Sequence, residues 1–445
     1  MDHKEFDNII IGAGPAGMRA CAIAREKGES VCVVERREVG GTCLNRGCIP
    51  TKALVQSASV ISTVASASGF GVEITGEIHH DYAVASARKD EVVASLRKGA
   101  EMAIGADTVV YGDARIVSAD TVETGDLSLH ASKRLIIASG SEPARLRVPG
   151  AELAVTSDEF LHMTALPPEL VVIGGGVIGM ECACIANAFG CKVTVVEYCR
   201  EILPGLDSEM AKRLRSMLSR RGITVVVGAQ VTSLESTVQG EITVTYTDRR
   251  GDHTLTVPMV MMAAGRRAVV PDGLSDIGIE FTPAGAIGTD DSMHTSVPGI
   301  YAIGDCNGRL MLAHAASAQA EVAMGVRDSV GNVPSIVFTL PECAQVGVLT
   351  SDSPGALITG KAMYGANGMA SAMGQTEGFV KVAADAATRR IVGCCAIGAG
   401  ADAIVQEAAI AIAASMTVDD LRTRAVFAHP TLSEMLLSAL PVFKD

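Results

Sequence analysis

Residues 6–35 read FDNIIIGAGPAGMRACAIAREKGESVCVVE, and this stretch decides what kind of fold the chain adopts. An apolar strand leads into a turn that carries Gly12, Gly14 and Gly17, and a helical run follows. A second apolar strand then ends at Glu35. Glycines so placed let the backbone approach a pyrophosphate at a helix N-terminus, and the terminal acid can accept a hydrogen bond from a ribose hydroxyl. The stretch therefore predicts a dinucleotide-binding unit.

The same order of elements returns later in the chain. A strand leads into a turn with Gly174, Gly176 and Gly179, and the next strand ends at Glu197. One glycine fingerprint alone often marks only a tight turn, but two complete units indicate two bound dinucleotides. Glu197 can bond to a free 2′-hydroxyl and repels a 2′-phosphate, which favours NAD over NADP. Arg200 leaves the phosphate open as an alternative, because a nearby arginine can accept it.

Between the two units, residues 40–52 read GGTCLNRGCIPTK and pair Cys43 with Cys48. A regular helix holds residues five apart at about 8–9 Å between Cα atoms, whereas a disulfide needs about 4.4–6.8 Å. We therefore expect the backbone to bend between the two cysteines. The residues that can break it are Gly40, Gly41, Gly47 and Pro50. A strained, accessible disulfide is readily opened by a thiolate, which suits a redox role, and the plain alternative is two free buried thiols.

Later strands return to the two dinucleotide units. The strands at 135–141 and 260–266 end in small residues, so each can close one unit without colliding with a cofactor. The strand at 300–305 ends in Asp305, which suits a hydrogen bond to a flavin, although an Asp after Gly also forms plain turns. A helix that begins after residue 311 would direct its N-terminal dipole at a reduced flavin. A redox cysteine pair after the first unit makes FAD there, and a nicotinamide at the second unit, the economical assignment.

Composition excludes several classes of function. The 445 residues are enough for about three domains. The net charge of −13 argues against nucleic acid or an anionic membrane as the main partner. We find no signal segment and no uninterrupted apolar stretch near eighteen residues, so we expect a cytoplasmic protein. The twelve cysteines lack the spacing of a disulfide framework or a zinc site, and we expect no metal.

With these motifs the chain resembles the dihydrolipoyl dehydrogenases, within the FAD-dependent pyridine nucleotide–disulfide oxidoreductases. The shared motifs run in order along the chain: the first glycine turn, 40–52, 174–181, 202–207, 302–305 and 429–434. The resemblance implies an α/β fold with two Rossmann-like dinucleotide-binding domains, for FAD and NAD, and a C-terminal α+β dimerisation domain.

The resemblance also implies domain limits. We expect residues 1–147 to form the first part of the FAD domain and residues 148–270 to form the NAD domain. A central segment, 271–333, should return to the FAD site. Residues 334–445 should form the interface domain, with a hairpin over 378–395.

Roles for the sulfur-handling residues follow from the same resemblance. Cys43 would be the thiol that meets the substrate, and Cys48 the thiol against the flavin. Lys52 and Glu181 would pair beside the reactive edge of the flavin ring, since a buried lysine without such a partner tends to lose its charge. Read without the family, both are ordinary helix residues.

His429 resembles the general base of the family. Imidazole titrates near neutral pH and can take the proton that a dihydrolipoyl thiol must lose. Glu434 would orient the ring and stabilise its cationic form. In this family the base serves the disulfide of the neighbouring subunit, so the resemblance implies a homodimer with shared active sites. On sequence alone, a histidine before proline is more often a turn residue.

The expected cofactor contacts form two sets. The FAD set is Gly12, Gly14, Gly17, Glu35, Thr42, Lys52, Ala114, Ser139, Gly140, Ser141, Asp305, Met311, Leu312, Ala313 and His314. The NAD set is Gly174, Gly176, Gly179, Glu181, Glu197, Val231 and Gly265.

The implied reaction is oxidation of protein-bound dihydrolipoamide to lipoamide, with reduction of NAD+ to NADH. The partner would be a lipoylated protein of a 2-oxo acid dehydrogenase complex or of the glycine cleavage system. One alternative is a reductase of the same group that uses NADH or NADPH to reduce another small disulfide or mercuric ion. A non-catalytic redox sensor is a third reading, which the acid–base pair of His429 and Glu434 argues against.

Overall fold

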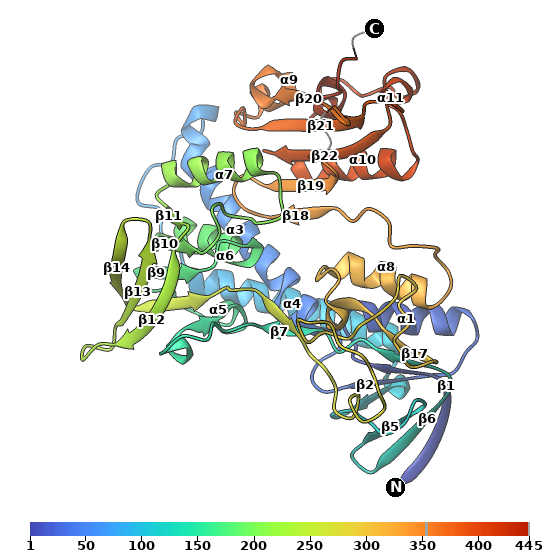
Figure 1. The fold of residues 1–445 in the computed structure, drawn as a ribbon. Coiled ribbons are helices and arrows are strands. Elements are labelled where there is room, and N and C mark those ends of the chain that lie inside the picture. Colours follow the sequence, from blue (N-terminus) through green and yellow to red (C-terminus); the bar gives the residue numbers. More distant parts are fainter. Residues whose placement is uncertain (352–354, 444–445) are drawn as a thin grey trace.

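The expected α/β fold with three sheet-based parts is confirmed. The computed structural model describes residues 1–351 and 355–443, so residues 352–354 and 444–445 of the expected interface domain lie outside the described part. Figure 1 shows a mixed, mainly parallel sheet at the N-terminal end, a parallel sheet beside it, and an antiparallel sheet at the C-terminal end. The domain limits themselves stay predictions.

The first sheet has the strand order β3-β2-β1-β6-β5-β4, and β17 pairs with β6. Its strands are β1 (Asp2–Ile11), β2 (Val31–Glu35), β3 (Val109–Tyr111), β4 (Arg115–Ile116), β5 (Thr121–Thr124), β6 (Leu127–Ile137) and β17 (Ile300–Ala302). Strands β3, β2, β1, β6 and β17 run parallel, as expected of a nucleotide-binding sheet with apolar central strands. The sheet is therefore completed by a strand that lies beyond the second sheet in sequence.

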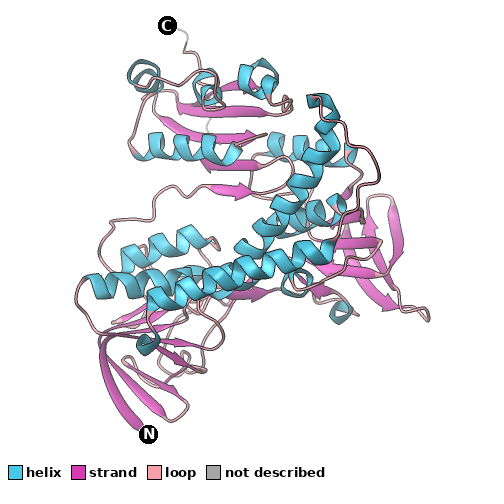
Figure 2. Cartoon of the chain, turned by 180° about the vertical axis from the view of Figure 1, so that it is seen from behind, coloured by secondary structure: helices cyan, strands magenta, loops and turns pink. Residues whose placement is uncertain are grey.

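Helices cover this sheet and connect it to its neighbours. Helices α1 (Pro15–Glu26) and α8 (Ala313–Ala323) lie side by side against it (Figure 1). Seen from behind, the long helices α3 (Cys48–Ser66) and α4 (Tyr82–Ile104) run across the middle of the molecule (Figure 2). Pro15 begins α1, where its missing N–H costs no helix hydrogen bond.

The helical stretch 41–70, which contains α3, corrects one expectation. By length and composition alone it is long and apolar enough to cross a membrane, and only 17% of its apolar window is buried within the chain. We expected no such stretch, because serines and threonines interrupt the apolar residues. They add no charge, however, so the mean hydropathy stays high. The outer half of α3 exposes Val60 together with Ser62, Thr63 and Ser66, so its uncovered surface is partly polar.

The second sheet, in the order β11-β10-β9-β15-β8, is entirely parallel. Its strands are β8 (Val155–Thr156), β9 (Glu169–Ile173), β10 (Lys192–Glu197), β11 (Thr224–Val227) and β15 (Met259–Met262). Its helices are α5 (Ser157–Leu161), α6 (Val177–Ala188) and α7 (Ser208–Arg220). An antiparallel meander of β12 (Gln230–Ser236), β13 (Ile242–Asp248) and β14 (Gly251–Val257) lies beside it, and β7 (Ser141–Pro143) pairs with β16 (Arg266–Ala268).

The C-terminal sheet contains the expected hairpin. Its strands are β18 (Ser335–Val337), β19 (Cys343–Gly347), β20 (Leu357–Met363), β21 (Phe379–Asp385) and β22 (Ile391–Ile397), in the order β18-β19-β22-β21-β20. Helix α10 (Ala401–Ala413) packs on it through Ile404, Ala408 and Ala411, which are buried as their spacing predicts. The remaining helices here are α9 (Gly368–Ala372), α11 (Val418–Arg424) and α12 (Glu434–Ser438).

Asp207 connects the second sheet to the C-terminal sheet. Its carboxylate accepts hydrogen bonds from the backbone of Glu209 and Met210 at the start of α7. The other carboxylate oxygen lies 2.6 Å from the ammonium of Lys381 on β21. The backbone N–H of Asp207 donates to the Gln345 side chain on β19 at 2.6 Å. These contacts hold the two parts in one arrangement.

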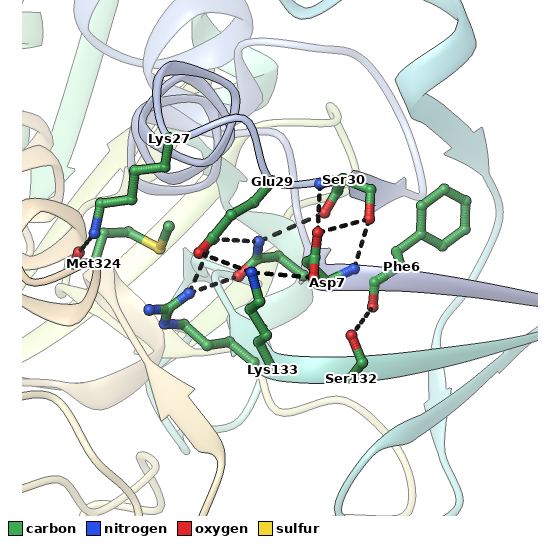
Figure 3. A network of polar contacts seen from close by, with 10 residues as sticks. Phe6, Asp7, Lys27, Glu29, Ser30, Ser132, Lys133 and Met324 are labelled. Atoms are coloured by element: carbon green, nitrogen blue, oxygen red, sulfur yellow. Dashed lines mark hydrogen bonds and ion pairs between the residues drawn. The ribbon is translucent and has the colours of Figure 1, made fainter.

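A polar network closes the outer end of the first sheet (Figure 3). The fully buried Asn8 side chain donates to Glu29 at 2.9 Å, and its oxygen accepts from Arg134 at 3.2 Å. Arg134 and Lys133 both contact the Glu29 carboxylate, at 3.0 and 3.3 Å. Lys133 also contacts Asp7 at 3.2 Å. Glu29 is thus the common acceptor of the network.

Replacing Glu29 should destabilise the protein at pH values above the range in which its carboxyl group titrates. We expect Glu29→Gln to lower the free energy of unfolding by about 1–2 kcal/mol at pH 7, because Arg134 loses a charged partner. Burial raises the pKa of Glu29, but the hydrogen bonds from Asn8 and Lys133 and the charges of Arg134 and Lys133 outweigh it, so the pKa is lowered. The stabilisation is complete above the unfolded pKa and is lost as the pH falls through the lower folded pKa.

Urea unfolding of both proteins at pH 7 and at decreasing pH below 5 measures this. The exposed Glu26→Gln variant is the matched control and should unfold like the wild type. A difference between wild type and Glu29→Gln that persists unchanged to the acid limit would contradict the assignment.

Candidate functional site

A single cavity of about 1350 Å³ lies between the two parallel sheets. Small-molecule sites usually measure about 300–1,000 Å³, so this cavity has room for more than one ligand of that size. Its walls come from the C-terminal ends of strands in both sheets, from the start of α3 and from the start of α8. The carboxyl edge of a parallel sheet is the usual place for a nucleotide.

The first glycine turn brings its backbone against the neighbouring strand. A Cβ on Gly12, whose φ is +106°, would lie 2.3 Å from the carbonyl oxygen of Ala138. A Cβ on Gly17 would lie 1.9 Å from the carbonyl oxygen of Gly12. Gly14 faces the cavity, and a Cβ there would meet only the Cα of Gly41, at 3.9 Å. Two glycines therefore shape the turn, and the third keeps its cavity side open.

The second glycine turn repeats this division. Added Cβ atoms on Gly174 and Gly179 would lie 2.3 Å from the Ala263 oxygen and 2.0 Å from the Gly174 oxygen. A Cβ on Gly176 would meet no protein atom within 4 Å, and this residue lines the cavity. Two separate turns of the chain thus have the same geometry.

Each terminal acid is fixed by its own turn. The Glu35 carboxylate accepts hydrogen bonds from the backbone of Ala13 at 2.7 Å and of Arg37 at 2.8 Å. The Glu197 carboxylate accepts from the backbone of Gly175 at 2.5 Å and of Cys199 at 2.6 Å. Both side chains are largely buried by the protein, and both line the cavity. Each carboxylate oxygen retains a second lone pair, so a ribose hydroxyl can still donate to it.

The cysteine pair lies where the backbone breaks. Helix α2 (Gly41–Arg46) ends before Gly47, whose φ of −139° and ψ of −106° are not helical, and α3 starts at Cys48. The expected bend between the cysteines is confirmed. Pro50 does not contribute to it: the residue lies in the first turn of α3, where a missing N–H breaks no hydrogen bond. Cys43 and Cys48 are half-buried thiols in this structure, and both line the cavity.

The two thiols have opposite electrostatic environments. The Cys43 thiol donates a hydrogen bond to the Cys48 sulfur, which lowers the pKa of Cys48. Burial opposes this effect and the Lys52 ammonium adds to it, and the net result is a lowered pKa for Cys48. The same hydrogen bond, together with burial, raises the pKa of Cys43. The surroundings therefore favour a thiolate at Cys48 over one at Cys43.

Lys52 and Glu181 pair at the wall of the cavity as expected. The ammonium donates to the two carboxylate oxygens of Glu181 at 3.1 and 3.0 Å. The carboxylate is buried on α6, while the lysine side chain from α3 is 33% exposed. The pair joins the segment that carries the cysteines to the second parallel sheet.

His429 and Glu434 form a hydrogen-bonded pair in the C-terminal part. The ring Nδ1 lies 3.0 Å from the Glu434 carboxylate, whose other oxygen accepts from the backbone of Thr431 at 3.0 Å. The Thr431 bond is the main cause, and the His429 contact the second, of a lowered pKa for Glu434. The His429 side chain is 79% exposed, and among the described residues neither member of the pair lines the cavity of its own chain.

The cavity gathers most of the expected contacts. The exceptions are Gly17, Ala114, Gly179, His429 and Glu434. Gly17 and Gly179 shape their turns from behind, and Ala114 packs against the apolar core of the first sheet. The sequence reading missed several residues that line the cavity: Arg36, Arg37, Asp158, Tyr198, Cys199, Gln230, Arg266, Ile336 and Phe338. Arg36 and Tyr198 directly follow the two terminal acids, Glu35 and Glu197, and this position in the sequence is a signal that could have found them.

Arg266 and Ser141 show how β16 and β7 support the cavity. The guanidinium donates to the hydroxyl of Ser141 at 2.7 Å and to its carbonyl at 2.8 Å. The hydroxyl donates to the Asp305 carboxylate at 2.5 Å. Asp305 is thus held in the cavity wall by a chain of hydrogen bonds, which a sequence pattern does not reveal.

The family model described as pyridine nucleotide-disulphide oxidoreductase matches residues 6–320, and that of the dimerisation domain of the same family matches residues 333–440. Similar curated proteins are the dihydrolipoyl dehydrogenases of Geobacillus stearothermophilus (36% identity; 98% of this chain and 96% of that protein) and Chlorobaculum tepidum (35%; 98% and 96%). A similar solved structure is the HOCl-induced flavoprotein disulfide reductase RclA from Escherichia coli, with a TM-score of 0.85, 26% identity, and coverage of 98% and 99%.

The cofactors of this family are FAD and NAD(H), and the residues of the cavity fit both. Each glycine turn faces the cavity through a glycine whose missing Cβ leaves open space, at Gly14 and Gly176. Each turn leads into a helix whose N-terminus can stabilise the negative charge of a pyrophosphate. Each turn also holds a carboxylate that can accept a hydrogen bond from a ribose hydroxyl. Among the described residues, no group of three or more His, Cys, Asp or Glu could hold a metal ion.

The two glycines of the second turn allow a matched test. Gly176→Ala adds a methyl group that meets only the cavity, so we expect an unchanged melting temperature and NAD+ affinity weakened about tenfold or more. Gly179→Ala places the same group against the Gly174 carbonyl, so we expect a loss of stability of about 1–3 kcal/mol. Calorimetric titration with NAD+ and thermal unfolding measure the two effects. Wild-type NAD+ affinity in Gly176→Ala would contradict this location of the nucleotide.

Proposed function

The chain belongs to the pyridine nucleotide-disulphide oxidoreductase family, and we propose that within it the protein is a dihydrolipoyl dehydrogenase. The observation that carries this proposal is the His429–Glu434 pair at 3.0 Å, in a chain whose cysteine pair lies in the cavity wall. A dithiol substrate must lose protons to reduce a disulfide, and an imidazole held by a carboxylate is suited to accept them. Full-length similarity to curated dihydrolipoyl dehydrogenases supports the same reading.

We infer a homodimer in which each His429–Glu434 pair serves the cysteines of the other subunit. The pair lies within the matched dimerisation domain and does not line the cavity of its own chain. The outer half of α3, where Val60 is exposed beside serines and threonines, supplies a surface for a second copy to cover. The thiol substrate would be the dihydrolipoyl group of a 2-oxo acid dehydrogenase complex or of the glycine cleavage system, in the cytoplasm.

In the proposed reaction, His429 takes the proton of one dihydrolipoyl thiol. The resulting thiolate attacks Cys43 in the oxidised cysteine pair, which breaks the Cys43–Cys48 bond and leaves Cys48 as a thiolate. The second substrate thiol then displaces Cys43 and its proton passes to the departing Cys43 sulfur, which closes the lipoyl disulfide and leaves Cys43 as a thiol and Cys48 as a thiolate. The lowered pKa suits Cys48 to this leaving role. When bound, FAD and NAD+ carry the electron pair onward to give NADH.

Removing the imidazole should separate the two half-reactions. We expect His429→Gln to slow oxidation of dihydrolipoamide by about 10²–10⁴-fold, because the substrate thiol loses its base. Reduction of the bound flavin by NADH should stay near the wild-type rate, since it does not involve this residue. Stopped-flow absorbance measures both rates. His130→Gln, which alters another exposed histidine beside an acid, is the control and should change neither rate.

Mixed dimers test whether the active site is shared. In a dimer of one Cys43→Ser subunit and one His429→Gln subunit, one site combines an intact Cys43 with an intact His429 only if the two residues come from different chains. We therefore expect about half of the wild-type activity from two-tag purified mixed dimers. Activity no higher than that of the parent variants would contradict the shared site.

A comparison of substrates separates the proposal from its alternative. The alternative is a reductase of another small disulfide or of mercuric ion, and it is favoured by similarity to the disulfide reductase RclA. We expect NADH formation from dihydrolipoamide to exceed NADPH or NADH oxidation by glutathione disulfide or mercuric ion in kcat/KM. The reverse order would overturn the proposal while leaving the family membership intact.

A further inference from the structure

Phe338 contacts both members of the Lys52–Glu181 pair. Its backbone N–H donates to the Glu181 carboxylate at 2.8 Å. The centre of its ring lies 4.7 Å from the Lys52 ammonium, within the range of a cation–π contact. The residue directly follows β18, at the start of the matched dimerisation domain, and it lines the same cavity as the cysteines.

The two charges of the pair differ in mobility. The Glu181 side chain is 4% exposed and receives hydrogen bonds from Lys52 and from the Phe338 backbone, so its position is fixed. The Lys52 ammonium is a compact charge on a flexible stem and is 33% exposed. The aromatic ring of Phe338 is a second contact of the ammonium, beside the carboxylate.

The position of this ammonium matters because the pair acts on Cys48 with opposing signs. Lys52 favours the Cys48 thiolate and Glu181 disfavours it, while the Cys43 thiol donates a hydrogen bond to it. Two opposite charges held together largely cancel at a distance, so the remaining field at Cys48 depends on where the ammonium lies between the carboxylate and the sulfur. A group that fixes the ammonium therefore fixes the stability of the thiolate.

We propose that Phe338 is a positioning residue that holds the Lys52 ammonium against Glu181 beside Cys48, so that the segment entering the dimerisation domain sets the stability of the thiolate. The inference rests on the proposed function only in taking Cys48 as the thiol that stays ionised in the reduced enzyme. Phe338 acts through Lys52 and needs no contact with the substrate.

The test measures the titration of Cys48 in the reduced holoenzyme. The rate of iodoacetamide labelling at Cys48 is followed against pH by mass spectrometry, in a Cys43→Ser background that leaves one thiol of the pair. Phe338→Leu removes the ring face and keeps the backbone N–H, and we expect it to raise the apparent pKa of Cys48 by about half a unit. Lys52→Met removes the ammonium and should shift it further in the same direction.

Phe338→Tyr is the matched control, because it keeps an aromatic face over the ammonium and should titrate like the parent protein. If Phe338→Leu lowers the yield of folded protein, Phe338→Met replaces it, since this side chain has similar bulk and no ring. A second readout, with Cys43 intact, is the long-wavelength absorbance band of the thiolate against the flavin in the reduced enzyme. This band should weaken with Leu or Met and persist with Tyr.

An unchanged titration and band in Phe338→Leu, while Lys52→Met shifts both, would overturn the inference. Equal shifts in Phe338→Tyr and Phe338→Leu would do the same. Neither result depends on the substrate: a protein that reduced another disulfide would still show the effect of Phe338. Conversely, normal dihydrolipoamide oxidation with no change at Cys48 would remove the inference and leave the proposed function standing.

Discussion

Two backbone carbonyl groups, of Ala138 and Ala263, come so close to glycines that no side chain can stand between them. This approach, at Gly12 and Gly174, brings the ends of neighbouring parallel strands together at the edge of each sheet. The acids at the ends of β2 and β10 then hydrogen-bond to the same turns, so turn, strand and acid form one rigid unit. The cavity and the segment that carries the two thiols lie against these units. Their positions therefore depend on the close contact between each glycine and its neighbouring carbonyl group.

The local parts of this architecture could be predicted from the sequence, because their causes lie within a few residues. The two glycine units, the break between the cysteines and the hairpin of β21 and β22 all follow from spacing and residue type. Pro50 shows the limit of that reasoning, because proline breaks a helix only beyond its first turn. The first residue of α3 could not be predicted closely enough to place Pro50 within or beyond that turn. The exposure of the outer half of α3 was not predicted either, because burial depends on what packs against a helix.

The non-local parts of the site required the structure. Phe338 lies 157 residues from Glu181 along the chain, and no sequence pattern near either residue predicts the hydrogen bond between them. The link from Arg266 through Ser141 to Asp305 is equally remote in sequence. In contrast, His429 and Glu434 were paired from a local motif, and the structure shows the two side chains in contact. The family resemblance also implied that this pair serves a neighbouring subunit, and among the described residues neither side chain lines the cavity of its own chain.

The position of β17 has a consequence for how the chain matures on the ribosome. This strand completes the first sheet beside β6, yet more than 150 residues separate the two in sequence, including the whole second sheet (β6 ends at Ile137 and β17 begins at Ile300). The N-terminal part emerges first but must wait with an open strand edge, whereas the second sheet is contiguous and can close as soon as it is translated. The middle of the polypeptide would therefore mature before its beginning, and nascent chains halted before β17 would expose an edge that invites misassembly.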